Sequence, residues 1–170
     1  MTFTLIGMPG CGKSCLGKIV SKRLGIGFID GDRLIEQIHG KKLYEIINES
    51  GLEAFKKIEE ETLLSIKDDN VILAPGGSAV YYDSVMQHCK KLGKVIYLYV
   101  SFPLIRARLG DYSKRGVVLK DGQTLEDLYN ERVKLYEKYA DIKINCNGLI
   151  YKKYQNRLVK AIMESWAEEK

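Results

Sequence analysis

The feature that most constrains the fold is a glycine-rich segment near the N-terminus. Residues 7–14 are Gly-Met-Pro-Gly-Cys-Gly-Lys-Ser, which matches the phosphate-binding pattern G-x-x-x-x-G-K-[ST] at every fixed position. A short apolar, β-branched segment at 2–6 precedes it, and residues 13–24 carry apolar side chains at helical spacing. A strand, a glycine turn and a helix in this order predict a phosphate-binding loop at the start of an α/β domain.

Each position of this loop has a chemical reason. The glycines allow successive backbone N–H groups to point into one concavity, and the start of the following helix adds partial positive charge there. Lys13 supplies a full charge for the β- and γ-phosphates, and the Ser14 hydroxyl is a ligand for Mg²⁺. We therefore expect ATP as co-substrate and Mg²⁺ as cofactor. The nucleotide contacts predicted from the loop come from Gly7, Gly10, Cys11, Gly12, Lys13, Ser14 and Cys15.

The rest of the chain alternates strand-like and helix-like patterns. Strands are expected at 2–6, 27–30, 71–74, 94–100 and 142–145, and helices at 13–24, 33–67 with a break near 49–51, 82–91, 102–109, 124–139 and 150–166. Such alternation predicts a parallel sheet covered on both faces with right-handed crossovers. The fold class expected is therefore α/β, a three-layer P-loop NTPase fold with a five-stranded parallel sheet, in a single domain over 1–170.

Composition and charge indicate where the protein is located and which classes of partner it binds. Its 170 residues are 45% hydrophobic and 29% charged, with a net charge of +5 and no apolar run long enough to span a bilayer. The N-terminus lacks the pattern of an export signal, and the four cysteines form no C-x-x-C pair. The basic residues are spread rather than clustered. We expect a cytoplasmic monomer that binds small molecules, without a nucleic-acid or membrane partner. Cys11 could be a reactive thiol or, as we favour, a small filler.

Two acidic residues follow the second expected strand. In an extended segment alternate side chains point the same way, so Asp30 and Asp32 could both face the phosphate loop. One would hold Mg²⁺, and the other would accept a proton from an attacking hydroxyl. The alternative is a solvated Asp-Gly-Asp turn. After the third strand, Gly76 and Gly77 either let a ligand approach the backbone closely or only form a tight turn.

Arg132 lies on the apolar face of its expected helix. That face is formed by Leu125, Leu128, Tyr129 and Tyr136. A guanidinium on such a face needs an anionic partner or a route to water. A bound carboxylate would satisfy it with two hydrogen bonds, whereas a side chain reaching past the edge of the stripe would need no ligand.

Taken together, these motifs resemble the shikimate kinase family from about residue 4 to 147. The resemblance is carried by the phosphate loop, Asp30 and Asp32, Gly51 followed by Phe55-Lys56-Lys57-Ile58-Glu59, the Gly76-Gly77 pair, Arg108, Arg115, and Arg132 with Tyr136. It implies a five-stranded parallel sheet with a helical substrate-binding section at about 31–62 and a lid at about 110–123. It also implies ATP-dependent phosphorylation of shikimate to 3-phosphoshikimate.

The resemblance assigns roles residue by residue. Asp30 would help to position Mg²⁺, and Asp32 would bind the substrate hydroxyls and act as the base. Arg132 would bind the substrate carboxylate. Arg115 would enter from the lid to stabilise the transferring phosphoryl group, and Arg108 would lie over the adenine. Catalytic roles thus fall to Lys13, Asp32 and Arg115, and substrate contacts to Asp32, Lys56, Gly76, Gly77, Ser78 and Arg132.

Three positions depart from the family pattern. Lys56 stands where the family usually has arginine, Ser78 where it usually has a third glycine, and Gly116 where proline usually follows the lid arginine. Lysine keeps the charge but loses the planar fork that suits a carboxylate. These departures keep open a kinase of the same architecture that acts on another small, hydroxylated, anionic metabolite. A nucleotide-binding regulatory protein without an acceptor is a third possibility.

Overall fold

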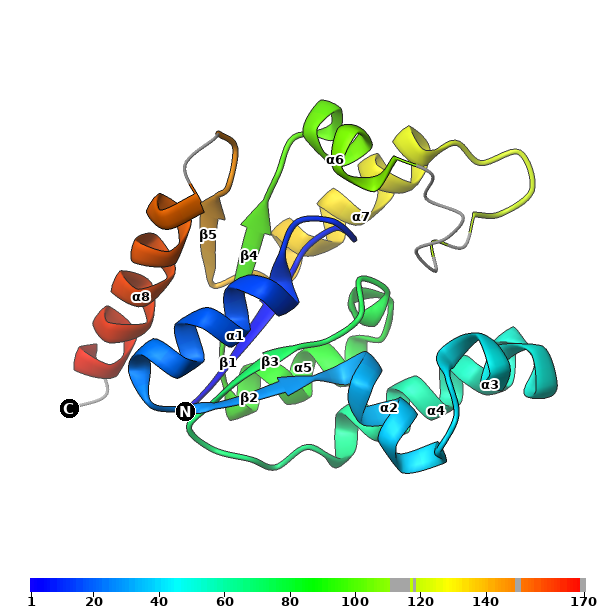
Figure 1. Ribbon diagram of the computed structural model, residues 1–170, viewed down its shortest axis with the longest axis horizontal. Helices are drawn as coiled ribbons and strands as arrows, with labels where there is room; N and C mark the ends of the chain where they lie inside the picture. Colours follow the sequence, from blue (N-terminus) through cyan, green and yellow to red (C-terminus); the bar gives the residue numbers. More distant parts are fainter. Residues whose placement is uncertain (111–116, 118, 149–150, 169–170) are drawn as a thin grey trace.

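The computed structural model describes residues 1–110, 117, 119–148 and 151–168, and its strands form one five-stranded sheet (Figure 1). The strand order is β2-β3-β1-β4-β5, and every neighbouring pair is parallel. The strands are β1 (Thr2–Ile6), β2 (Gly27–Asp30), β3 (Val71–Ala74), β4 (Gly93–Tyr99) and β5 (Ile142–Asn145). The expected parallel α/β sheet is confirmed, and all its carboxyl ends therefore meet along one edge.

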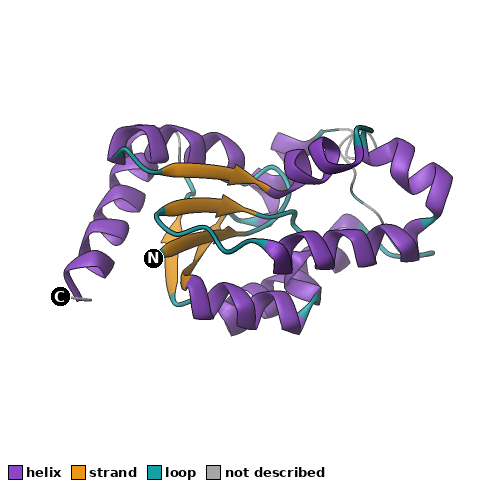
Figure 2. Cartoon of the chain, turned by 90° about the horizontal axis from the view of Figure 1, so that it is seen from below, coloured by secondary structure: helices purple, strands orange, loops and turns teal. Residues whose placement is uncertain are grey.

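Helices cover both faces of the sheet (Figure 2). On one face α1 packs against β2 and β3, and α8 packs against α1 and β5; on the other, α5 packs against β1 and β4 while α7 contacts β4. The described helices are α1 (Lys13–Leu24), α2 (Gly31–His39), α3 (Leu43–Ser50), α4 (Leu52–Ser65), the 3₁₀ turn η1 (Ala79–Tyr81), α5 (Asp83–Leu92), α6 (Phe102–Leu109), α7 (Leu125–Tyr139) and α8 (Tyr151–Glu168). None of them is both long and apolar enough to cross a bilayer.

The central strand explains the three-layer arrangement. All five residues of β1 are buried, as expected for a parallel strand with helices on both sides. Phe3 and Leu5 are fully buried, and Trp166 of α8 meets the Phe3 ring edge-on at 5.6 Å between centroids. The apolar β1 thus anchors the start of the phosphate loop in the core of the sheet.

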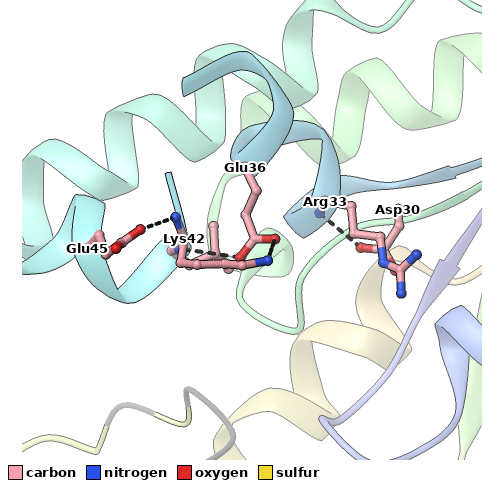
Figure 3. Close-up of polar contacts among 6 residues, drawn as sticks. Asp30, Arg33, Glu36, Lys42 and Glu45 are labelled. Carbon is pink, nitrogen blue, oxygen red and sulfur yellow. Dashed lines mark hydrogen bonds and ion pairs between the residues drawn. The ribbon is translucent and has the colours of Figure 1, made fainter. Parts of the chain in front are cut away.

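The helical region after β2 differs from the expectation in one respect. Besides the predicted break before α4, a second break separates α2 from α3 at residues 40–42, where Gly40 has a φ of 64°. Figure 3 shows how polar contacts join the two helices. The Glu36 carboxylate pairs with Lys42 Nζ at 3.1 Å, and the Glu45 carboxylate accepts a hydrogen bond from the Lys42 backbone N–H at 2.6 Å.

A small apolar cluster holds α2, α3 and α4 together. Ile35, Ile46 and Phe55, one from each helix, are buried against each other and form a core separate from that of the sheet. In Figure 1 these three helices extend beyond the carboxyl end of β2. They therefore form a wall beside the phosphate loop, and the C-terminal part of α4 joins the core of the sheet through Leu63.

Candidate active site

A cavity of about 870 Å³ lies between the phosphate loop and the wall formed by α2, α3 and α4. It opens at the carboxyl ends of β2 and β3, where the sheet topology places ligand sites. Most of the predicted site residues line it: Gly10, Gly12, Lys13, Ser14, Cys15, Asp30, Asp32, Lys56, Gly76, Gly77, Ser78 and Arg132. Gly7 and Cys11 of the loop, and Arg108 next to it, lie outside this lining. Arg115 and Gly116 lie outside the described residues.

The phosphate loop has the backbone geometry that its glycines permit. Gly12 is the N-cap of α1 with a φ of 100°, a left-handed conformation that side chains rarely adopt. A Cβ on Gly7 would lie 2.8 Å from the sulfur of Cys11 and 2.8 Å from the carbonyl oxygen of Leu98. Glycine is therefore required at both ends of the loop: Gly12 for its backbone conformation and Gly7 for its close packing.

Lys13 brings its charge to the loop. Its ammonium donates hydrogen bonds to the carbonyl oxygens of Gly7 at 2.8 Å and Met8 at 3.1 Å, and the residue is only 9% exposed. The first turn of α1 begins at the same residue, so the helix N-terminus and a full positive charge meet at one wall of the cavity. This arrangement suits a polyphosphate.

The two cysteines of this region differ in their surroundings. Cys11 is 5% exposed and its sulfur packs in the main apolar core, whereas Cys15 is exposed and lines the cavity. The packing supports the filler interpretation of the Cys11 side chain. Arg108 lies next to Gly10, and its guanidinium donates to the carbonyl oxygen of Cys146 at 3.5 Å.

Asp30 and Asp32 do not lie together in the extended segment that the sequence predicts. Strand β2 ends at Asp30, which is the N-cap of α2, and its carboxylate accepts a hydrogen bond from the Arg33 backbone N–H at 3.3 Å (Figure 3). Asp32 lies in the first turn of that helix. Helical turn geometry, not strand alternation, therefore places both carboxylates on the cavity.

The pKa of Asp32 is raised to about 6. Removal from bulk water is the largest cause, followed by the negative charges of Asp30 and Glu59, while Lys13 acts in the opposite direction. The side chain is open to the cavity although protein groups surround it. A carboxylate with a pKa near neutrality is suited to accept a proton from a hydroxyl at physiological pH.

The glycine pair after β3 keeps space free between charged groups. A Cβ on Gly76 would lie 2.8 Å from Glu59 Oε1 and 3.2 Å from Asp32 Oδ1. A Cβ on Gly77 would lie 3.0 Å from Pro9 Cδ and 3.1 Å from Arg132 Nη1. Side chains here would fill the volume between the carboxylates and the guanidinium, which favours ligand approach over a simple turn.

Arg132 is buried on the apolar stripe of α7, as the sequence predicted, with 7% of its surface exposed. Its Nε donates to the Tyr81 hydroxyl at 3.4 Å, and its guanidinium lies 5.3 Å from the centre of that ring. The Tyr81 hydroxyl in turn donates to Glu131 at 2.5 Å. Within the described part of the chain no carboxylate forms an ion pair with Arg132, so its charge is directed to the cavity.

Glu59 is the main site residue without a role in the sequence prediction. It is 3% exposed, and its two carboxylate oxygens accept hydrogen bonds from Ser78 at 2.8 Å and Tyr82 at 2.7 Å. The signal that could have found it is the one used for Arg132. Glu59 lies four residues after Phe55 and four before Leu63, both buried on the same face of α4.

Two oxygen groups in the cavity suit a hard cation. Ser14 is exposed on the first turn of α1, and the Asp30 carboxylate uses one oxygen in its helix cap, which leaves the other for a ligand. Among the described residues no three His, Cys, Asp or Glu side chains form a cluster that could hold a metal alone. Mg²⁺ commonly takes one or two protein oxygens together with phosphates and waters, so the two groups fit it.

Comparisons with known proteins agree with this geometry. The shikimate kinase family model matches residues 9–163. A shikimate kinase of Clostridium botulinum (strain Eklund 17B / Type B) is 40% identical over 145 residues, which cover 85% of this chain and 86% of the relative. One from Thermodesulfovibrio yellowstonii is 34% identical over 159 residues, covering 92% and 91%.

Solved structures give the same result. Shikimate kinase from Acinetobacter baumannii, in complex with shikimate, superposes with a TM-score of 0.84 at 27% identity and covers 96% of this chain and 93% of that one. The enzyme from Aquifex aeolicus has a TM-score of 0.81 at 27% identity, with 99% and 98% covered. Both the sequence match and the fold extend over nearly the whole chain. The chain belongs to the shikimate kinase family.

Proposed function

We propose that this protein transfers the γ-phosphoryl group of ATP to a hydroxyl group of shikimate and forms 3-phosphoshikimate. One observation carries the proposal: the Asp32 carboxylate and the Arg132 guanidinium approach the neighbouring glycines 76 and 77 from two sides, in a cavity that also contains Lys13. Shikimate has both hydroxyl groups for the first and a carboxylate for the second. The binding of shikimate by the Acinetobacter relative supports this choice of acceptor.

Each charged group then has a defined task. Arg132 binds the acceptor carboxylate and fixes the orientation of the ring. Asp32, with a pKa of about 6, accepts the proton of the attacking hydroxyl. Lys13 stabilises the negative charge on the phosphates, so catalysis rests on positioning and electrostatics rather than on a covalent enzyme intermediate.

Magnesium, bound through Ser14 and Asp30, would neutralise charge on the β- and γ-phosphates. We propose in addition that residues 31–62 form the acceptor-binding section and that 110–123 form a lid that carries Arg115. The position of Lys120 and Gln123 on the cavity lining supports a lid in this part of the chain. All four thiols are free, which supports a reducing, cytoplasmic setting.

A coupled assay of ADP release tests the proposal. Shikimate should be phosphorylated well above the background hydrolysis of ATP, and the methyl ester of shikimate should be a poor substrate because it lacks the charge that Arg132 binds. A panel of other hydroxy acids and polyols is the control for acceptor choice. If one of these compounds is phosphorylated while shikimate stays at background, the acceptor is wrong but the kinase chemistry remains.

A further inference from the structure

The carboxylate of Glu59 is buried in the cavity wall but has no cationic partner among the described residues. Both of its oxygens are instead occupied by hydroxyl donors, Ser78 Oγ on Oε1 at 2.8 Å and the Tyr82 hydroxyl on Oε2 at 2.7 Å. Ser78 has a φ of −83° and a ψ of −13°, an ordinary helical conformation that needs no glycine. Serine is therefore accepted here without backbone strain, and its side chain points toward Glu59.

The nearest helical neighbours of Glu59 explain why a cation is not used. Glu53, Lys56 and Glu59 are spaced three residues apart on α4, so Lys56 has a carboxylate within reach in either direction. Its ammonium pairs with Glu53 at 2.6 Å. The two oxygens of Glu59 already have their donors, whereas the Glu53 side chain is 83% exposed and free to move toward the lysine.

The position of Glu59 matters for the acceptor. Glu59 Oε1 and Asp32 Oδ1 converge on the space above Gly76, at 2.8 Å and 3.2 Å from where a Cβ would be, and Ser78 Oγ lies 3.6 Å from the same point. A rotation of the Glu59 carboxylate would therefore change the surface that an acceptor hydroxyl meets next to Asp32. The two donors hold this surface in place.

We propose that Ser78 and Tyr82 are positioning residues for acceptor binding, because they fix the Glu59 carboxylate beside Asp32 above Gly76. The same geometry couples the two departures from the family pattern: Ser78 occupies the carboxylate oxygen that an arginine at position 56 would otherwise bind. The inference rests on the proposed function, since it concerns the acceptor site of that reaction.

The coupling has a simple physical cause. Without the Ser78 hydroxyl, Glu59 Oε1 becomes a buried acceptor with no donor, and Lys56 can turn from Glu53 to Glu59 to replace it. Such a turn draws the carboxylate toward the ammonium and away from its place above Gly76. An arginine would reach the same oxygen with a planar fork and hold it in a defined geometry.

The first test removes the hydroxyls singly. Ser78→Ala and Tyr82→Phe should each raise the KM for shikimate about tenfold or more, the effect of losing one hydrogen bond to a charged group, with a KM for ATP within about twofold of the parent value. Ser78→Thr keeps the hydroxyl and should recover most of the affinity for shikimate that Ser78→Ala loses. Ser84→Ala is the matched control, because Ser84 also donates to a glutamate of α4, Glu60, but on the exposed surface.

The second test is a double-mutant cycle. Lys56→Arg should lower the KM for shikimate at least about threefold more in a Ser78→Gly background than in the parent, because the guanidinium then finds Glu59 free. Equal effects in both backgrounds would overturn the coupling. A KM for ATP that rises in parallel with that for shikimate would overturn the positioning role and indicate a general loss of structure.

A crystal structure of Ser78→Ala separates this inference from the proposed function. The expected result is a Glu59 carboxylate displaced from Tyr82 or paired with Lys56, and an unmoved carboxylate would overturn the inference whether or not shikimate is turned over. Conversely, a parent protein without activity on shikimate would remove the proposed acceptor, while the displacement of Glu59 would still be measured in the crystal.

Discussion

Replacing Asp32 with asparagine should abolish phosphoryl transfer and, at neutral pH, stabilise the fold. The pKa of this carboxyl is about 6 in the folded protein and 3.8 when it is fully solvated, so the folded state holds the proton more tightly. Stability gained from this group is present below pH 4 and is lost as the pH rises through 6. An asparagine at this position would carry no charge at any pH and would therefore not lose this contribution.

The size of the effect follows from the pKa shift. A shift from 3.8 to about 6 corresponds to roughly 3 kcal/mol if water does not reach the charge. Because the Asp32 side chain is open to the cavity, water screens part of this energy, and about 1–2 kcal/mol remains. The difference in free energy of unfolding between Asp32→Asn and the parent should thus grow by this amount from pH 4 to pH 8.

Urea denaturation at both pH values, with EDTA and without nucleotide, measures this difference directly. Comparing the two pH values cancels any constant effect of the amide on hydrogen bonding. Asp127→Asn is the matched control: hydrogen bonds from the Thr124 hydroxyl and backbone N–H hold the pKa of Asp127 below its usual value, so its difference should stay flat from pH 8 down to pH 5 and should not grow over the whole range from pH 4 to pH 8. A flat profile for Asp32→Asn as well would show that the pKa of Asp32 is not raised, and this carboxyl would then lack the near-neutral pKa that suits a base.

Three further outcomes are expected from the site. Lys13→Ala should lower kcat by at least about a hundredfold, since it removes a charge at the transferring group, and isothermal titration should show weaker ATP binding. Arg132→Lys should raise the KM for shikimate about tenfold or more without changing that for ATP, because an ammonium cannot make the paired contact; equal changes in both would contradict the assignment. The acidic limb of the pH profile of kcat/KM should lie near pH 6. Glu59→Gln should move this limb to lower pH, because it removes one of the negative charges that raise the pKa of Asp32. A shift to higher pH would show that Glu59 does not raise this pKa.

The fold could be predicted because local and global signals agree. Strand β1 is β-branched or apolar at every position and buried along its whole length, and the phosphate loop connects it directly to α1. A capping box starts α7, where the Thr124 hydroxyl accepts a hydrogen bond from the Asp127 backbone N–H at 3.1 Å. Short-range rules of this kind need no knowledge of tertiary contacts.

The sequence misleads where two rules compete. Asp30 ends a strand and caps a helix at once, and the strand rule predicts the wrong geometry for Asp32 because Asp-Gly-Asp-Arg is also a helix start. The break at Gly40 is absent from the sequence prediction although glycine after His39 is a common helix end. On α4 the buried face includes Glu59, whereas the apolar Leu52 is 36% exposed, so hydrophobic periodicity alone does not identify this face.

The way in which Glu59 is held affects the charge that surrounds Asp32. Hydroxyl groups satisfy its oxygens without cancelling its charge, whereas a guanidinium at position 56 would neutralise much of it. Burial and the charge of Asp30 raise the pKa of Asp32 most, and the uncancelled charge of Glu59 adds to them. Glu59 itself, held by its two hydroxyl donors, does not compete for Arg132 or Lys13. Serine instead of glycine at position 78 thus allows lysine instead of arginine at position 56. Arg132 and Lys13 then remain directed at anionic ligands.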